Sequence, residues 1–204
     1  MSLSGGQLAG GNSVSEKAEN DYYATDPRTV ELFLNAFTEL KDFKGSIWEC
    51  SCGGGNIAEV MRKHFPQNEL IATDLVYRNY GKRESINFLE TDIRADLIIT
   101  NPPFSLINDF IKQALKLSNR YVIFLAKIQT LETVERKELL ENSPLKYVYV
   151  HSSRQATWKN GEPLDPNGDK WSTTMCLAWF IWDKEYKGEP VVRFVGNSLR
   201  KGLF

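Results

Sequence analysis

Four consecutive residues, Asn101, Pro102, Pro103 and Phe104, place a side-chain amide, a rigid backbone and an aromatic ring side by side. The apolar run 97–99 before them predicts a buried strand, which the prolines must end because neither has the N–H that a strand ladder requires. Asn101 is therefore expected at the carboxyl end of a strand, where open α/β sheets bind ligands. These residues could bind a flat polar group.

The same four residues also suit a role without chemistry. Asn, Pro and the following Ser105 are common in turns that connect a strand to a helix. The tetrapeptide taken alone leaves both interpretations open.

A second group of residues could bind a nucleoside. Gly53 and Gly55 form a G-x-G turn between a predicted strand, 46–50, and a predicted helix. Such a turn lets a ligand approach the backbone, and the helix N-terminus offers N–H groups to a carboxylate or phosphate. Asp74 ends the next predicted strand, 69–73, and can accept both hydroxyls of a ribose. Because a third glycine is missing, we expect a single nucleoside rather than a dinucleotide.

Alternating strands and helices must position these residues, which predicts an α/β fold with a doubly wound, Rossmann-like sheet. We expect seven strands, mostly parallel, with helices on both faces. The last strand should return antiparallel to the sixth, because no helix fits between them. The expected strands are 46–50, 69–73, 86–89, 97–99, 121–126, 146–151 and 174–183, with 191–195 as a further edge strand. One expected helix begins at Pro27, another opens from the glycine turn in 51–61, and two more span 106–117 and 131–141.

Length and composition indicate one domain. The 204 residues, 42% of them hydrophobic, can bury one core, which we assign to 21–204. The Gly/Ser-rich segment 1–20 is expected to be a flexible leader, part of it a cloning remnant. The net charge of −1 predicts that any contact with nucleic acid is local.

The cysteines and histidines argue against a metal site. Three cysteines without C-x-x-C spacing and two histidines do not form a zinc-binding pattern. Because the sequence shows neither a signal peptide nor an apolar run of 18 residues, we expect a cytoplasmic protein that does not enter a membrane.

The order of these motifs resembles the class I S-adenosylmethionine-dependent methyltransferases. Asn-Pro-Pro-Phe is similar to the catalytic motif of amino-group methyltransferases, and the arrangement resembles phage-type and Dam-like DNA N6-adenine methyltransferases. In that family a Tyr-x-Thr-Pro-like segment, here 22–27, precedes a Glu-x-Ser-x-Gly-x-Gly motif, here 49–55. Two departures are the insertion of Asp26 before Pro27 and the presence of Cys50 where proline is usual.

The resemblance implies S-adenosylmethionine as the cofactor. Glu49 would organise the glycine turn and approach the methionine amino group, and Asp74 would bind the ribose. Asp92 would accept a hydrogen bond from the cofactor's adenine, on which Ile93 would pack. Either aspartate could instead be a helix cap or a turn residue. The implied cofactor-binding residues are Tyr22, Tyr23, Thr25, Glu49, Ser51, Gly53, Gly55, Asp74, Leu75, Asp92 and Ile93.

The resemblance also gives the tetrapeptide a catalytic role. The side-chain oxygen of Asn101 and the carbonyl of Pro102 would each accept one N–H of an adenine amino group, which aligns the nitrogen and stabilises its developing positive charge. Phe104 would stack on the base, which must first be flipped out of a duplex. A core aromatic is the alternative for Phe104. Neither a metal nor a general base of unusual pKa is then needed.

Target selection is assigned to the turn-rich segment 152–171, in which Arg154, Trp158 and Lys159 could contact nucleic acid. A solvent-exposed connector is the alternative for this segment. We expect DNA to be the partner. Methylation of an RNA adenine or of a protein glutamine amide, and a catalytically silent S-adenosylmethionine-binding protein, remain the alternative functions.

Overall fold

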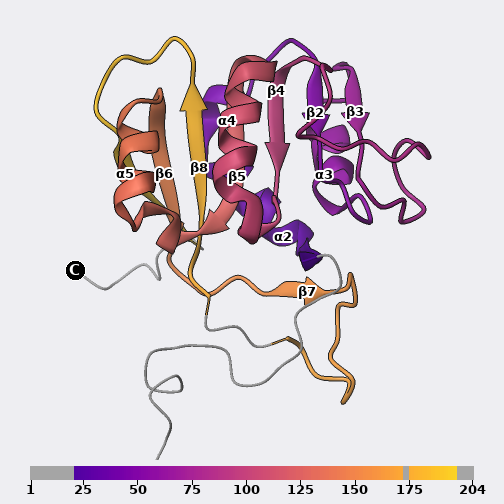
Figure 1. Cartoon of the computed structure of the whole chain (residues 1–204). Coiled ribbons are helices and arrows are strands. Elements are labelled where there is room, and N and C mark those ends of the chain that lie inside the picture. The colour runs from indigo at the N-terminus through magenta and orange to yellow at the C-terminus, as the bar shows by residue number, and fades with distance from the viewer. Residues whose placement is uncertain (1–20, 172–174, 197–204) are drawn as a thin grey trace, which may run out of the picture.

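A seven-stranded sheet forms the centre of the computed structural model, which describes residues 21–171 and 175–196 (Figure 1). The strand order is β3-β2-β4-β5-β8-β6-β9. Six strands run parallel and β8 runs antiparallel to both of its neighbours. The bounds are β2 Ile47–Glu49, β3 Leu70–Ala72, β4 Ala95–Thr100, β5 Ser118–Lys127, β6 Leu145–His151, β8 Leu177–Asp183 and β9 Val191–Val195.

The predicted Rossmann-like α/β class is confirmed, but two details of the predicted sheet are wrong. Residues 86–89 form no strand, because Ile86 bonds through its N–H to the Asp74 carbonyl and 88–90 form a turn. The antiparallel pairing of β8 with β6 and the edge strand β9 are both confirmed, but β9 pairs parallel with β6 and follows β8, so the antiparallel strand is not the last one. A short apolar run does not by itself distinguish a strand from a buried turn.

Helices cover both faces of the sheet, as predicted (Figure 1). One face packs against α2 and α3 in a core that includes Phe33 and Trp179, and the other packs against α4 in a core that includes Phe110 and Trp182. Alternate residues of each strand enter the two cores because successive side chains point to opposite faces. The bounds are α2 Pro27–Ala36, α3 Asn56–His64, α4 Ile107–Leu117 and α5 Val134–Glu141, with short 3-10 helices at Thr38–Leu40, Phe104–Leu106 and Ile128–Leu131.

Local signals fix where the first two helices begin. The side chain of Asp26 accepts the Arg28 N–H, which caps α2 directly before Pro27. Helix α3 begins after Gly55, whose φ of +88° is strained for any residue with a Cβ. The glycine turn therefore ends in the left-handed conformation that starts α3.

A second, two-stranded sheet lies beyond the carboxyl ends of β2, β3 and β4 (Figure 1). Strand β1, Tyr23–Thr25, pairs antiparallel with β7, Thr157–Lys159. The segment 152–171 was predicted to be a loop, so β7 is a correction. This pairing joins the N-terminal segment to a part of the chain more than 130 residues away.

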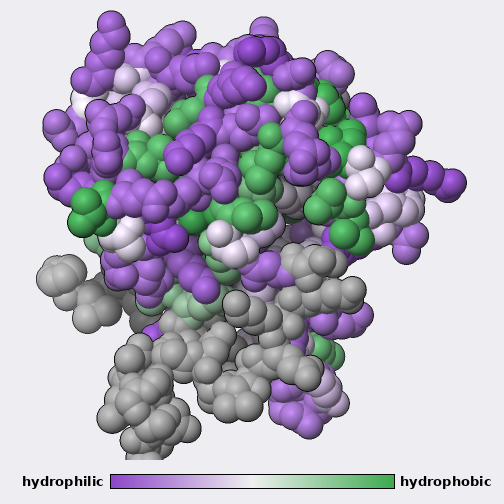
Figure 2. Space-filling view, in the orientation of Figure 1, coloured by the Kyte–Doolittle hydropathy of each residue, from purple (hydrophilic) through white to green (hydrophobic). Residues whose placement is uncertain are grey.

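The outer surface over α4 and α5 is mostly hydrophilic, with scattered hydrophobic side chains (Figure 2). In the part of the chain that the structure describes, no helix is long and apolar enough to cross a membrane. The predicted leader 1–20 and the first residue of the strand expected at 174–183 lie outside the described residues.

Candidate active site

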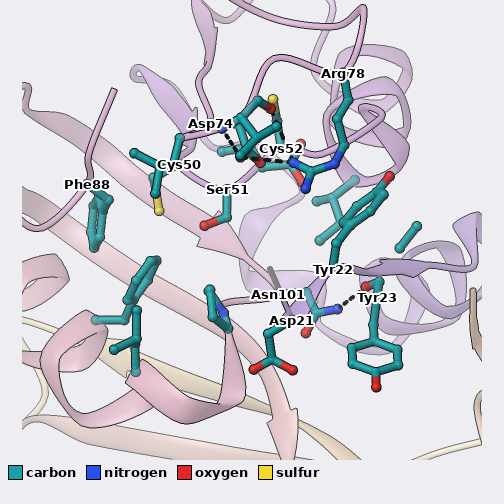
Figure 3. Close-up of a pocket in the computed structure, with 18 of the residues that line it drawn as sticks. Asp21, Tyr22, Tyr23, Cys50, Ser51, Cys52, Asp74, Arg78, Phe88 and Asn101 are labelled. Carbon is teal, nitrogen blue, oxygen red and sulfur yellow. Dashed lines mark hydrogen bonds and ion pairs between the residues drawn. The ribbon is translucent and has the colours of Figure 1, made fainter. Parts of the chain in front are cut away.

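A pocket opens at the carboxyl ends of β2, β3 and β4, where the β1 segment covers the sheet (Figure 3). It contains about 840 Å³ of empty space, part of it open to solvent. The predicted site residues that line it are Tyr22, Tyr23, Thr25, Glu49, Ser51, Asp74, Leu75, Asn101 and Pro103.

The glycine turn is close to the pocket, but its N–H groups are already engaged. Gly53 donates to the Asp74 carboxylate at 2.7 Å and Gly54 donates to the Tyr22 hydroxyl at 2.9 Å. The rings of Tyr22 and Tyr80 lie against Gly53 and Gly55, so closely that a Cβ on either glycine would come within 2.5 Å of a ring carbon. In this structure the two tyrosine rings cover the backbone of the glycine turn, and a role for Gly53 and Gly55 in cofactor binding stays a prediction.

Asp74 lies at the end of β3, as predicted, and its carboxylate organises the pocket wall. Besides the Gly53 N–H, it accepts the Val76 N–H at 2.9 Å and pairs with the Arg78 guanidinium at 3.3 Å. The guanidinium also lies over the Tyr22 ring, 4.1 Å from its centroid (Figure 3). Arg78 was not predicted, and because 74–78 is not a helix, its spacing from Asp74 gave no signal that the two would pair.

Glu49 is buried at the end of β2, where its carboxylate accepts the Ala58 N–H at 2.7 Å. Burial raises the pKa of Glu49 well above its usual value. Burial also raises the pKa of the neighbouring Cys50 and Cys52 thiols, in the case of Cys52 to about 12. Both thiols therefore stay protonated near neutral pH and cannot act as nucleophiles.

Asn101 presents an acceptor without a partner. Its side-chain nitrogen donates to the Tyr23 carbonyl at 2.8 Å (Figure 3). Because a carbonyl can only accept, the amide nitrogen must face it, and Oδ1 points the other way. Oδ1 is buried and has no hydrogen-bond partner among the residues that the structure describes. Thr25 also lines the pocket, and its hydroxyl is buried with no hydrogen-bond partner among the described residues.

Phe104 lies just outside the pocket, in the turn that follows Pro102 and Pro103. Its ring stacks on Tyr23 at 6.3 Å between centroids, with 21° between the planes. The Lys127 ammonium at the end of β5 lies 4.6 Å from the centre of the Phe104 ring. Phe104 is only half-buried, so part of its ring is accessible, unlike that of an aromatic side chain fully enclosed in the core. Lys127 was not among the predicted site residues.

Asp92 and Ile93 do not line the pocket, contrary to the role implied for them. Asp92 is exposed, and Ile93 packs against the core beneath α4. Because 86–89 turns back beside Asp74 instead of forming a strand, Asn87 and Phe88 enter the pocket instead. Phe88 lies across the pocket from Tyr22 (Figure 3).

The predicted nucleic-acid contacts Arg154, Trp158 and Lys159 do not line the pocket either. They lie in the segment 152–171, two of them in β7, where Lys159 is directly opposite Tyr23 and Trp158 is opposite Ala24. Opposite residues of an antiparallel pair share a face, so Lys159 lies on the same face of this small sheet as Tyr23.

The pocket combines acceptor side chains with aromatic side chains, and Phe88 and Tyr22 lie on opposite sides of it. Within the described residues, no group of three or more His, Cys, Asp or Glu side chains could hold a metal ion. The acceptors Asp74, Thr25 and Asn101 suit a ligand that carries hydroxyl or amino groups.

Comparison with known proteins identifies one matching family. The model of the family described as adenine-specific methyltransferase EcoRI matches residues 73–190, more than half of the chain. No curated protein matches the chain.

Several solved structures share the fold. The modification subunit ascribed to a type I restriction enzyme of Vibrio vulnificus YJ016 has a TM-score of 0.59 and 14% identity, over 89% of this chain and 48% of that one. The type I restriction enzyme EcoKI M protein has a TM-score of 0.55 and 10% identity, over 78% and 43%. The ribosomal protein L11 methylase of Lactobacillus delbrueckii subsp. bulgaricus has a TM-score of 0.51 and 17% identity, over 82% and 84%. This chain therefore spans about half the length of the two restriction-enzyme subunits.

Proposed function

Because this chain belongs to the EcoRI family of adenine-specific methyltransferases, within the class I S-adenosylmethionine-dependent methyltransferases, we propose that it methylates the N6 amino group of adenine in DNA. The cofactor is S-adenosylmethionine, which supplies a methyl group already activated on a sulfonium.

The unpartnered Oδ1 of Asn101 is the single observation that carries this proposal. A buried acceptor without a donor costs roughly 1–3 kcal/mol, so such an atom needs a reason to remain. An adenine amino group supplies that reason, because one of its N–H bonds can satisfy Oδ1 and the other can reach the Pro102 carbonyl. The bond from Asn101 to Tyr23 holds Oδ1 in place before the substrate arrives.

The pocket residues fit the proposed cofactor. Asp74 accepts from Gly53, Val76 and Arg78, which leaves about one of its four acceptor sites, on Oδ2, for a ribose hydroxyl. The buried Thr25 hydroxyl and the Glu49 carboxylate can face the amino acid end. Phe88 and Asn87 are better placed than Asp92 and Ile93 to contact an adenine ring.

The residues around Asn101 act on the target amine. An adenine amino group is a weak nucleophile because its lone pair is delocalised into the ring. Two fixed acceptors orient the nitrogen and stabilise the positive charge that develops on it during transfer. We assign these acceptor roles to Oδ1 of Asn101, which lines the pocket, and to the carbonyl of the adjacent Pro102, which does not line it.

Phe104 and its neighbours suit a flipped base. A base on the Phe104 ring would gain about 1–3 kcal/mol from stacking, which offsets part of the few kcal/mol that flipping costs. Lys127 above that ring and Lys159 opposite Tyr23 are cations from separate elements that could contact the phosphates beside the flipped nucleotide. We assign target selection to 152–171, with Arg154, Trp158 and Lys159 as contacts.

The rival substrates are an RNA adenine and a protein glutamine amide, since each also presents an amino group conjugated to a π-system. Incubation with methyl-tritiated S-adenosylmethionine and unmethylated DNA, RNA or protein distinguishes them. We expect label in DNA, recovered as N6-methyladenine after digestion. Label that enters only RNA or protein contradicts the proposal.

A matched control excludes a contaminating enzyme and a silent binding protein. The Asn101→Ala variant, purified in the same way, should still bind S-adenosylhomocysteine but transfer no label. If the wild-type protein binds S-adenosylhomocysteine yet labels none of the three substrates, the chain is a cofactor-binding protein without transferase activity.

A further inference from the structure

Tyr22 connects two parts of the molecule that are far apart in sequence. On one side its hydroxyl accepts the Gly54 N–H at 2.9 Å, and its ring packs on Gly53 in the glycine turn. On the other side its backbone carbonyl accepts the Asn160 N–H at 3.0 Å. The segment 152–171, called the arm below, is thereby bonded to a residue of the cofactor pocket.

The side chain of Tyr22 also contacts the arm directly. Gly161 has a φ of +82°, and a Cβ there would come 3.0 Å from the Tyr22 hydroxyl oxygen. The Arg78 guanidinium packs on the ring of Tyr22 and pairs with Asp74 at the proposed ribose site. The Tyr22 ring is therefore held between the glycine turn, Arg78 and the arm.

We propose that Tyr22 is a positioning residue that couples the arm to the cofactor pocket, so that cofactor binding orders the arm for DNA. This inference rests on the proposed function. A ligand that contacts Tyr22 in the pocket also restrains the arm bonded to it, and the arm then loses less entropy when it engages DNA. By linkage, a change in the arm that displaces Tyr22 must weaken cofactor binding, although no arm residue lines the pocket.

Two glycines of the arm provide a matched pair of variants. Gly161 and Gly168 have φ values of +82° and +84°, so alanine imposes similar backbone strain at both. Around Gly168 no atom lies within 4 Å of the added Cβ, whereas at Gly161 the Cβ meets Tyr22. Gly161→Ala therefore tests the contact, and Gly168→Ala controls for the strain.

The experiment combines isothermal titration of S-adenosylhomocysteine with hydrogen exchange of the arm. In the wild-type protein and in Gly168→Ala, S-adenosylhomocysteine should slow exchange of the amides at 157–161. Gly161→Ala should raise the dissociation constant at least about fivefold and reduce that protection. Thermal unfolding of each variant verifies that it is folded.

Tyr22→Phe supplies a second test if Gly161→Ala does not fold. It keeps the ring and removes the hydroxyl that Gly54 bonds, so S-adenosylhomocysteine should bind more weakly and should protect 157–161 less than in the wild-type protein. If the wild-type protein binds S-adenosylhomocysteine without any change at 157–161, or if the two glycine variants behave alike, the coupling is refuted and the proposed function stands. If the wild-type protein does not bind S-adenosylhomocysteine, both are refuted.

Discussion

The side-chain nitrogen of Asn101 donates to the backbone carbonyl of Tyr23 at 2.8 Å, and this bond fixes the direction of the amide oxygen. The Asn-Pro-Pro-Phe turn after β4 is thereby oriented by a strand that belongs to the other sheet. The acceptor is preorganised, so substrate binding does not have to reorient it.

Asn101→Ala removes that acceptor. We expect the rate of methyl transfer to fall by on the order of a hundredfold or more, because one preorganised contact to the reacting group is lost. Affinity for S-adenosylhomocysteine should stay nearly unchanged, since the role that we propose for Oδ1 is toward the target amine. Single-turnover kinetics and titration measure the two effects, and unchanged turnover would show that the turn is only architectural.

Asp74 and Asp92 make a matched pair for the cofactor site. Asp74→Ala should weaken S-adenosylhomocysteine binding by about 1.5–3 kcal/mol, the usual value for a charged hydrogen bond. Asp92→Ala should bind like the wild-type protein, because Asp92 is exposed outside the pocket. Isothermal titration compares the two variants, and a larger loss at Asp92 would restore the role that the sequence motif implied for it.

Phe104→Ala should weaken DNA binding rather than cofactor binding. The expected loss is about 1–3 kcal/mol, because the base loses its stacking partner. It should appear as a raised KM for DNA. Phe104→Tyr keeps an aromatic ring beside Lys127 and should retain most of the affinity. A Phe104→Ala variant with wild-type KM would mean that the ring only packs on Tyr23.

Replacing Arg154, Trp158 and Lys159 together by alanine should lower the methylation rate and change sequence preference across a random DNA library. Few phosphate contacts are expected, so the salt dependence of DNA binding should be shallow. Lys112→Ala with Lys116→Ala on α4 removes as many charges and serves as the control. Should rate and preference both survive in the triple variant, recognition belongs to another segment or to a partner protein.

His151 predicts a loss of stability in acid. Both of its ring nitrogens are buried without a partner among the described residues, and burial lowers its pKa from 6.5 to about 4. Between pH 6.5 and pH 4 the unfolded state binds more protons than the folded state. The free energy of unfolding therefore falls as the pH falls through this window, and at pH 5 it is about 2 kcal/mol lower than at pH 8.

His151→Leu removes this titration. Denaturant unfolding at pH 8 and pH 5 measures how much the free energy of unfolding changes with pH, and this change should be smaller for the variant than for the wild-type protein. Equal differences in the two proteins would mean that His151 does not titrate in this window.

The sequence alone determined the features that depend on neighbouring residues. Pro102 and Pro103 end β4 because they lack N–H groups, so Asn101 had to lie at the carboxyl end of a strand. Asp26 and Pro27 start α2 through a local cap. The position of Asp74 at the end of β3 followed from the same local pattern of apolar run, turn and acid.

Only the tertiary structure decided which distant segments meet. Strands β1 and β7 have three residues each, too few for a periodic signal, and their pairing depends on contacts across the whole chain. The turn at 86–89 brings Phe88 into the pocket and leaves Asp92 outside because its backbone bonds to Asp74 rather than to a strand. Tyr22, Arg78 and Gly161 likewise meet through long-range packing, which no spacing in the sequence encodes.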